Sequence, residues 1–379
     1  MQTLFAIDLF FEKWLLSGKH WQRKLFFLLV IVIPSINFCL NLGYYVPFMK
    51  TFWKHAAFDH KEGFAGINGI CCFFWDWLSY QTNDLLMLAV RVYDFDRPYN
   101  MRFRLWAPLL MKTLGFKYAY QMYLLQVAMG FAYVALLIGT VKQMVQDRLS
   151  VAYFCLGFCG LYAGMAYYAD MRGYHDAWGF FFLLAALYFR NPIWVAVAVF
   201  FGCWVDERVV FNMCFVFFFH AYYTDAPAKK ILQIPFTKAT VAIIVGIVLY
   251  LIIRFSLQFA YDIPTPTGQP TLFHHVRFGL KDIGLRMWGG MEGFWLLILL
   301  MITGFVAQKQ WLKLLLMGGS ALLCCFVVFM QADYVRTFSF SFPMFFVALA
   351  AIKNEFSTPQ LRYLLLGIAA LTLIYPMYF

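Results

Sequence analysis

The segment LSVAYFCLGFCGLYAGMAYYADMRGYHDAWGFFFLLAALYFR, residues 149–190, decides the fold class of this chain. It contains two apolar runs, 149–168 and 177–190, separated by a polar cluster that extends from Asp170 to Asp176. A helix that crosses a membrane needs about 20 mainly apolar residues. The segment therefore predicts two membrane helices joined by a short polar connection.

The same alternation of apolar runs and polar connections continues along the chain. Hydrophobic residues make up 63% of the 379 residues and charged residues 13%, which is too apolar for a soluble protein of this length. Continuous apolar runs exclude a porin-like barrel, whose strands would alternate apolar and polar residues. We predict an all-α polytopic membrane protein, a single domain over 1–379 with about eleven transmembrane helices. The predicted spans are 25–47, 118–140, 149–168, 177–190, 193–205, 209–223, 239–259, 291–308, 312–330, 338–352 and 361–378.

Basic residues predict the orientation of this domain. With a cytoplasmic N-terminus, most short cytoplasmic connections carry several basic residues and the short outer connections carry one each, as the positive-inside rule requires. The rule carries less weight for the two long outer loops, 48–117 and 260–290, because it holds mainly for short connections. An odd number of spans leaves the C-terminus outside. The cytoplasmic basic residues are Lys142, Arg148, Arg190, Lys229, Lys230, Lys238, Lys309, Lys313, Lys353 and Arg362, and the outer ones are Arg172, Arg208 and Arg336.

The N-terminal region is predicted to stay attached to the membrane. Residues 2–17 place apolar and charged side chains at roughly helical spacing, which is typical of an interfacial helix on the cytoplasmic surface. Basic residues then precede a full-length span, so we expect a retained signal anchor. The net charge of +11 reflects topology and anionic headgroups rather than nucleic acid. We expect an integral protein of the plasma (inner) membrane, and a compact chain without a long outer domain is typical of bacteria.

Polar clusters interrupt the apolar chain at places that the topology puts on one face. Ionisable side chains beside a hydrocarbon layer are costly unless they are paired or wetted, so they indicate function. We therefore predict one shared site on the outer face. The four short clusters are Asp170 to Asp176, Asp206 to Arg208, His274 to Arg277 and Asp333 to Arg336, and the first outer loop adds Asp76, Asp84, Asp94 and Asp96.

The first outer loop, 48–117, is predicted to carry helices of its own. Residues 84–93 and 101–114 have an amphipathic helical rhythm, and Pro98 separates them. Such helices, rich in aromatic residues, are expected to lie flat on the outer membrane surface. In the same loop Asp76 and Tyr80 stand four residues apart, so on a helix they would share a face.

Three motifs together resemble a known class of enzymes. The first loop holds Asp76-x-x-x-Tyr80, then Arg102-x-Arg104-x-x-x-Pro108-Leu109-Leu110, and later an Asp206-Glu207-Arg208 turn closes a helical hairpin. In these motifs, and in the long first outer loop followed by a multi-span bundle, the chain resembles bacterial polytopic glycosyltransferases of the GT-C class and membrane proteins grouped with them. The resemblance implies transfer of a sugar from a polyprenyl-phosphate donor to a lipid-linked or cell-surface glycan acceptor at the extracytoplasmic face.

The resemblance also implies roles for particular residues. A carboxylate must take the proton of the acceptor, and Asp76, near Tyr80, matches the first-loop acid of the class. Asp206 and Glu207 are the further candidate catalytic acids. The departing phosphate needs cations, and the arginine fork suits phosphate. The candidates for substrate and phosphate binding are Arg102, Arg104, Arg172, His175, Asp176, Arg208, His274, His275, Arg277 and Arg336.

Each role has a plainer alternative in the sequence. Asp76 is also suited to cap a helix that begins near Trp77. Arg208 can pair with the acids of its own turn, although two acids against one base leave a surplus for a sugar hydroxyl or a second arginine. His175 can be a solvated loop residue. No ligand spacing predicts a metal site, so no cofactor is expected, although a divalent cation is compatible with the chemistry.

Other functions are compatible with the same pattern. A polysaccharide polymerase or ligase on the same lipid carriers would share outward-facing arginine and acid clusters. A lipid or solute transporter (flippase) would explain the many spans, but transport sites lie near the bilayer midplane at broken helices, and the chain shows no internal repeat. A membrane-bound acyltransferase needs a histidine buried among spans, and His220 is predicted at the wrong side.

Overall fold

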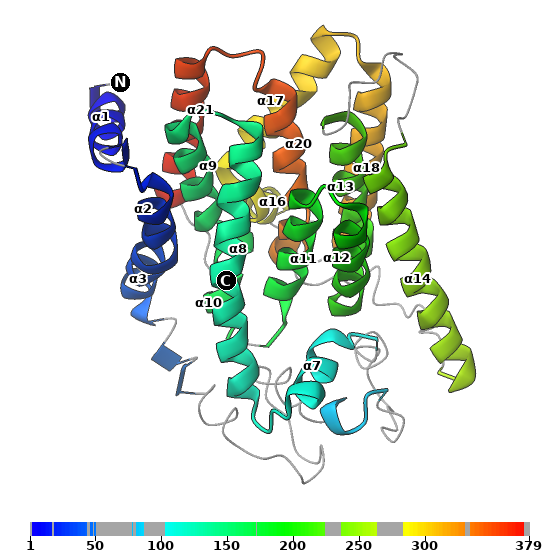
Figure 1. The fold of residues 1–379 in the computed structure, drawn as a ribbon. Coiled ribbons are helices and arrows are strands. Elements are labelled where there is room, and N and C mark those ends of the chain that lie inside the picture. The colour runs from blue at the N-terminus through cyan, green and yellow to red at the C-terminus, as the bar shows by residue number, and fades with distance from the viewer. Residues whose placement is uncertain are drawn as a thin grey trace.

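The structure is a computed structural model that describes residues 2–16, 19–43, 46–47, 49–50, 78, 81–86, 103–171, 173–223, 236–263, 283–329 and 334–374. Within these ranges every regular element is a helix, which confirms the all-α prediction (Figure 1). The helices are α1 Gln2–Leu16, α2 Trp21–Phe27, the π-helical η1 Leu28–Val32, α3 Ile33–Leu40, α7 Trp106–Leu114, α8 Ala119–Met144, α9 Arg148–Gly160, α10 Tyr162–Ala169, α11 Asp176–Tyr188, α12 Pro192–Val205, α13 Glu207–Tyr223, α14 Lys238–Ala260, α16 Ile283–Met291, the 3-10 helix η2 Glu292–Phe294, α17 Trp295–Ala307, α18 Trp311–Phe329, α19 Tyr334–Ser339, α20 Pro343–Ile352 and α21 Thr358–Ile374.

Several of these helices are long and apolar enough to cross a membrane. Five helical stretches meet this requirement, and the pair α9 and α10, bent by 58°, makes up to six. The chain is therefore an all-α membrane protein. Each of the eleven predicted spans overlaps a helix, but α11, α12, α20 and α21 are shorter than a full span, so the count of eleven stays a prediction. The five long stretches are Trp21–Leu40, Tyr120–Met144, Lys238–Ala260, Met287–Ala307 and Trp311–Val328.

Local sequence signals set where these helices begin. Asp147 accepts a hydrogen bond from the backbone of Ser150 and caps α9, and Asn191 caps α12 in the same way. Thr237 and Thr240 form a reciprocal capping pair at the start of α14. Such caps satisfy backbone N–H groups that have no partner within the helix. The caps therefore fix short connections between antiparallel helices.

Short connections gather at one end of the bundle, which we call the basic end. Arg190 donates a hydrogen bond to Gln143, and the Lys353 ammonium donates one to the carbonyl of Met144. Arg362 pairs there with Asp147 at 3.0 Å. The connections that precede α9, α12 and α21 therefore lie together (Figure 1). The residues of these connections are mostly those that the topology places in the cytoplasm.

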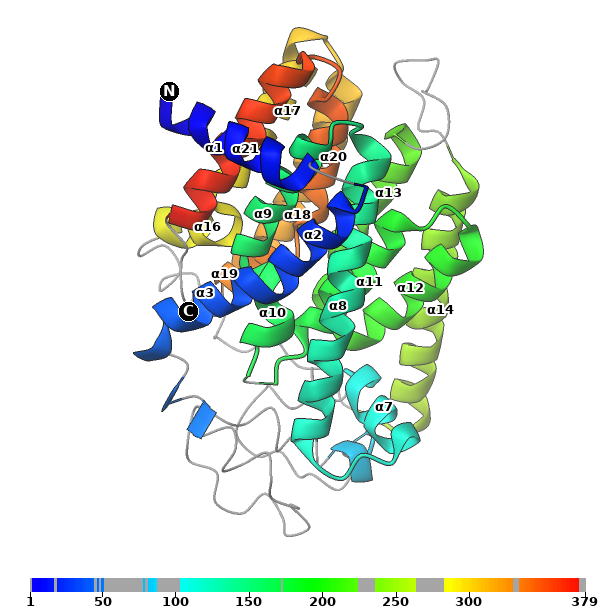
Figure 2. The same ribbon diagram turned by 60° about the vertical axis from the view of Figure 1, so that its left-hand side comes forward.

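The central helices are short and leave the opposite end recessed. Helices α11 and α12 have 13 and 14 residues, and the neighbouring α8 and α14 have 26 and 23. At 1.5 Å per residue the central pair is about 20 Å long and α8 about 39 Å. Helix α7 lies below the short helices, beside the lower part of α8 (Figures 1 and 2). We call this recessed end the site end.

Helix α7 is held against the short helices by aromatic packing. The Trp106 ring lies 4.8 Å from Phe182 and 5.0 Å from Phe201, centroid to centroid. Trp106 also contacts Trp178 at 5.6 Å. Gly115 ends the helix with a φ of +67°, a left-handed cap that favours glycine. The amphipathic helix predicted over 101–114 is therefore present in part: it begins at Trp106, and residues 103–105 are not helical. In the other predicted loop helix, 84–93, residues 84–86 form a bend and turn, and 87–93 lie outside the described residues.

The N-terminal helix predicted over 2–17 is present as α1 and is attached to the bundle. The Asp8 carboxylate is 5% exposed and accepts a hydrogen bond of 2.7 Å from the Tyr153 hydroxyl on α9. Arg362 on α21 lies 3.7 Å from the same carboxylate. A buried carboxylate is stable only when such partners are present. Helix α1 is therefore docked on α9 and α21 rather than resting only on a membrane surface.

Candidate functional site

A buried ion network lies at the site end of the bundle. Its centre is Asp176, the first residue of α11, which is fully buried. Asp176 Oδ1 accepts hydrogen bonds from Arg208 Nη2 at 2.8 Å and Arg336 Nη2 at 3.0 Å. Its Oδ2 accepts from Arg336 Nε at 2.7 Å and from the Tyr162 hydroxyl at 3.0 Å. One carboxylate thus joins helices α10, α11, α13 and α19.

The Asp206-Glu207-Arg208 turn forms the second part of the network. Asp206 Oδ1 accepts from Arg208 Nε at 2.7 Å and from the Arg208 backbone N–H at 2.9 Å. Its Oδ2 accepts from Arg208 Nη2 at 2.8 Å and lies 3.0 Å from Arg104 Nη1. The Glu207 carboxylate accepts hydrogen bonds from Arg104 Nη2 at 2.9 Å and from Arg104 Nε at 3.3 Å. The internal pair within the turn is therefore present, and the surplus acid holds a second arginine, Arg104.

The charges of this network are strongly coupled. Burial lowers the pKa of Arg104, but the charges of Asp206 and Glu207 outweigh it and hold the pKa above its ordinary value. Burial would raise the pKa of Asp206, yet the charges of Arg104 and Arg208 hold it well below the usual range. Ion pairs with several hydrogen bonds are the arrangement in which buried charges are tolerated. Arg104 and Asp206 are therefore both charged at neutral pH.

Aromatic rings complete the surroundings of the two innermost arginines. The Arg208 guanidinium lies 4.3 Å from the centroid of Phe340, and the Arg336 guanidinium lies 3.2 Å from that of Tyr174. Arg208 Nη1 also donates to the Thr337 hydroxyl at 3.4 Å. Arg208 is 2% exposed and each of its side-chain nitrogens already has a partner, so this group is not open to a phosphate.

Asp170 is a further carboxylate beside the network. It follows α10, is 3% exposed, and its Oδ1 accepts a hydrogen bond from the Tyr174 backbone N–H at 3.3 Å. Its Oδ2 has no hydrogen-bond partner in the described part of the chain. Burial, with the nearby Asp176 charge, raises the pKa of Asp170 to about 7. This carboxyl can therefore gain or lose a proton near neutral pH.

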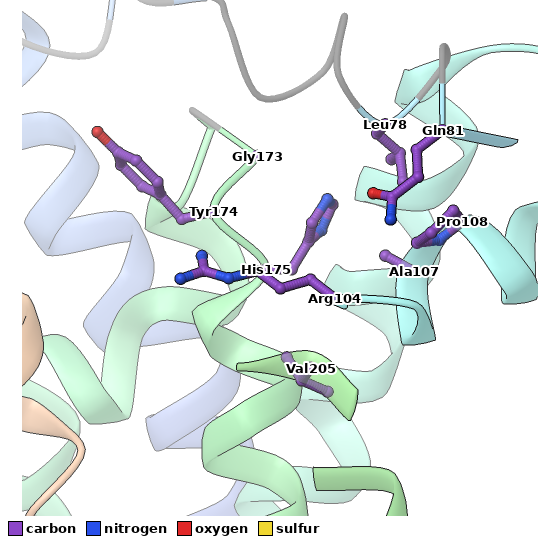
Figure 3. A pocket seen from close by; sticks show the side chains of 9 residues that line it. All are labelled: Leu78, Gln81, Arg104, Ala107, Pro108, Gly173, Tyr174, His175 and Val205. Atoms are coloured by element: carbon purple, nitrogen blue, oxygen red, sulfur yellow. The ribbon is translucent and has the colours of Figure 1, made fainter. Parts of the chain in front are cut away.

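A small hollow opens next to Arg104 between α7 and the connection that precedes α11 (Figure 3). Ala107 and Pro108 of α7 line one side, and Tyr174 and His175 line the other. Figure 3 shows the His175 ring turned into this space, toward the side where Gln81 lies. Burial lowers the pKa of His175 to about 4, so its ring is neutral at pH 7. His175 has a φ of +62°, which sets the direction of the side chain.

The structure brings together half of the residues predicted for the site. Glu207, 22% exposed, and Arg104, 18% exposed, are the accessible members of the network, and His175 lines the hollow. The predicted residues that the network and the hollow unite are Arg104, His175, Asp176, Asp206, Glu207, Arg208 and Arg336. The predicted residues outside the described ranges are Asp76, Tyr80, Arg102, Arg172, His274, His275 and Arg277.

Three members of the site were not predicted as site residues. Tyr162, Asp170 and Thr337 were missed. Asp170 carried a signal, because it opens the polar cluster that ends at Asp176, whereas Tyr162 sits within an apolar run. His220, predicted near the other face, donates a hydrogen bond from Nε2 to the Ala186 carbonyl at 2.8 Å and lies outside the network.

The described residues contain no group of three His, Cys, Asp or Glu side chains that could hold a metal ion. His55, Asp59 and His60, which stand close together in the sequence of the first loop, lie outside the described residues. Comparison with known proteins found no matching protein family, no matching curated protein and no matching solved structure.

Proposed function

We propose that this protein is an integral membrane glycosyltransferase that moves a sugar from a polyprenyl-phosphate donor to a lipid-linked or cell-surface glycan acceptor. The observation that carries the proposal is the ion network at the site end, with the hollow beside Arg104. Three arginines and three carboxylates from four distant segments share this place. Holding charged groups near a membrane is costly, and such groups commonly serve function.

The proposal includes the eleven-span topology with a cytoplasmic N-terminus. In that topology the short central helices cross a thinned part of the bilayer, and the site end faces the extracytoplasmic side. Helix α7 and the hollow beside Arg104 then lie at the depth of lipid headgroups. A lipid-linked phosphate in the outer leaflet could meet the hollow without leaving the membrane.

Arg104 is the residue best placed for the leaving phosphate. It lines the hollow, and both Arg104 and its partner Glu207 are partly exposed. A phosphate could replace Glu207 on the guanidinium while Asp206 keeps its contact on the other side. Arg208 and Arg336 are buried and act through Asp206 and Asp176, so we propose that they position Arg104 rather than touch the donor.

Proton transfer from the acceptor is proposed to use Asp76. This role rests on the resemblance of the first loop to the GT-C class. The neutral ring of His175 faces the hollow and is suited to hold a sugar or acceptor hydroxyl. An inverting transfer would then place the base and Arg104 on opposite sides of the sugar.

The proposal is tested with purified protein in liposomes that contain undecaprenyl-phosphate-linked radiolabelled hexoses and a lipid-linked acceptor. We expect transfer by the wild type, and a loss of about 100-fold or more in Arg104→Gln and in Asp76→Asn. Arg190→Gln is the matched control, because Arg190 is exposed at the opposite end. Movement of a labelled lipid between leaflets without any transfer would reject the glycosyltransferase proposal in favour of a flippase.

A further inference from the structure

A second site lies along α13, beyond the ion network at the start of that helix. Helices α14 and α18 both pack on α13 (Figure 1). Side chains of the three helices line a groove. The groove has a volume of about 400 Å³, within the range of sites that hold small organic molecules. Its walls include Phe217 and Phe218 of α13, Ile244 and Ile247 of α14, and Leu323 of α18. Such walls suit a hydrocarbon chain.

A lysine lies beside Tyr222, one of the residues that line the groove. Lys313, in the first turn of α18, is half-buried among aromatic rings. Its ammonium lies 5.2 Å from the ring centroid of Tyr222, 5.6 Å from Tyr223 and 6.0 Å from Phe305. Lys313 makes no ion pair with a carboxylate of the described residues. Among the described residues its charge therefore faces only aromatic rings, which attract cations weakly.

Two hydroxyl groups beside this lysine also lack partners. The hydroxyls of Tyr222 and Tyr223 are buried and form no hydrogen bond with any described residue. Tyr222 is 8% exposed and also lines the groove, so it joins the apolar part to the cationic part. Buried hydroxyls normally have a hydrogen-bond partner, and an acceptor oxygen would satisfy them.

We propose that this groove binds an anionic phospholipid, with an acyl chain along α13 and the phosphate at Lys313 and the Tyr222 hydroxyl. An apolar groove with a cation and two donors beside it matches the division of a phospholipid into tail and headgroup. The charge of Lys313 favours an anionic headgroup over a zwitterionic one. The proposed headgroup position is separate from the proposed transfer site, because Tyr222 and Arg208 lie at opposite ends of α13.

The test measures lipid binding to the full-length protein by native mass spectrometry in detergent. Phosphatidylglycerol and phosphatidylcholine are added at equal concentration, and the first is expected to bind about fivefold more tightly. Lys313→Gln is expected to remove this preference, and Tyr222→Phe to weaken phosphatidylglycerol binding about threefold. Ile247→Trp, which fills the groove, is expected to weaken binding of both lipids. The matched control is Lys309→Gln, an exposed lysine in the preceding connection, which is expected to bind as the wild type does.

Three outcomes would overturn the proposal. The first is an equal loss in Lys313→Gln and Lys309→Gln, which would indicate a general basic surface. The second is displacement of phosphatidylglycerol by inorganic phosphate at equal concentration, which would mean that the groove contributes nothing. The third is unchanged binding in both Tyr222→Phe and Ile247→Trp. None of these readouts depends on sugar transfer, so this proposal and the glycosyltransferase proposal can fail separately.

Discussion

Arg336 and Asp176, 160 residues apart in the chain, form a two-point pair in which Nε and Nη2 of the arginine lie 2.7 and 3.0 Å from the two oxygens of the carboxylate. The same carboxylate holds Arg208. Asp176 therefore balances two buried cations, and the bundle depends on it at the site end. Its removal takes a carboxylate from both arginines and leaves Arg208 with Asp206 alone as its acidic partner among the described residues.

We expect Asp176→Asn to lower the free energy of unfolding by about 3–5 kcal/mol, because two buried arginines lose their shared carboxylate. Unfolding in mixed micelles with increasing dodecyl sulfate measures this change. Asp262→Asn is the matched control, since Asp262 is exposed. It should change the free energy by less than about 0.5 kcal/mol. Similar losses in the two variants would contradict the assigned importance of the network.

Replacement of arginine by lysine should distinguish the inner arginine from the outer one. Lysine keeps the charge but cannot serve two carboxylates with a planar fork. Arg208 is 2% exposed and bridges Asp176 and Asp206, so Arg208→Lys should lower the free energy of unfolding by about 3 kcal/mol. Arg104 is 18% exposed, and Arg104→Lys should cost about 1 kcal/mol. The free energies of unfolding of both variants, measured in the same micelles, give the order of the two losses. A larger loss in Arg104→Lys than in Arg208→Lys would contradict the prediction.

The stability of the wild type should depend on pH through Asp170 and His175 in opposite directions. The pKa of Asp170 is raised to about 7, so its stabilising contribution is complete below about pH 4 and is lost as the pH rises to 7. The pKa of His175 is lowered to about 4, so its contribution is present above about pH 6.5 and is lost as the pH falls to 4. The two slopes oppose each other between about pH 4 and 6.5.

Single variants should separate these two slopes. In Asp170→Asn the free energy of unfolding should rise between about pH 4 and 6.5, because only His175 then titrates. In His175→Asn it should fall steadily from about pH 4 to 7. Asparagine is chosen at 175 because it tolerates the positive φ at this position. Identical pH profiles for the two variants would show that these groups are not the ones that titrate.

The bend between α9 and α10 should depend on Gly164. A Cβ at this position would lie 2.1 Å from the backbone oxygen of Phe158, and backbone cannot move aside as a flexible side chain can. Gly164→Ala should therefore destabilise the protein by about 2 kcal/mol. Gly304→Ala is the control in α17, where nothing lies within 4 Å of a Cβ, and it should be neutral or stabilising by up to about 1 kcal/mol. Thermal unfolding of the two variants measures the difference.

Removal of the Asp8 carboxylate should release α1 from the bundle. Asp8→Asn weakens the bonds to Tyr153 and Arg362, and hydrogen bonds to charged groups contribute about 1.5–3 kcal/mol. We expect faster amide hydrogen exchange over residues 2–16, with exchange in α8 unchanged. Tyr153→Phe should give part of the same increase. Unchanged exchange over 2–16 in both variants would mean that other contacts hold α1.

The sequence predicted that the polar clusters lie at one end of the bundle, because this follows from the number of membrane crossings between them. Asp176, Arg208 and Arg336 each follow or precede an apolar run, and an alternating path puts them at one end. Which residues pair with these three could be predicted from the sequence only in part. The surplus acid of the Asp206 turn indicated a second arginine, but only packing of α7 on α12 brought Arg104 to it.

The sequence by itself determined that this chain is a helical membrane protein, because long apolar runs can satisfy their backbone in lipid only as helices. It also determined that the charged residues collect at the helix ends. The tertiary structure alone decided which charge meets which. An ion pair such as that between Asp176 and Arg336 depends on the rotation and depth of helices far apart in the chain, and local pattern carries no information about either. For the same reason Lys313 looked like one more topological charge until packing placed it beside an apolar groove.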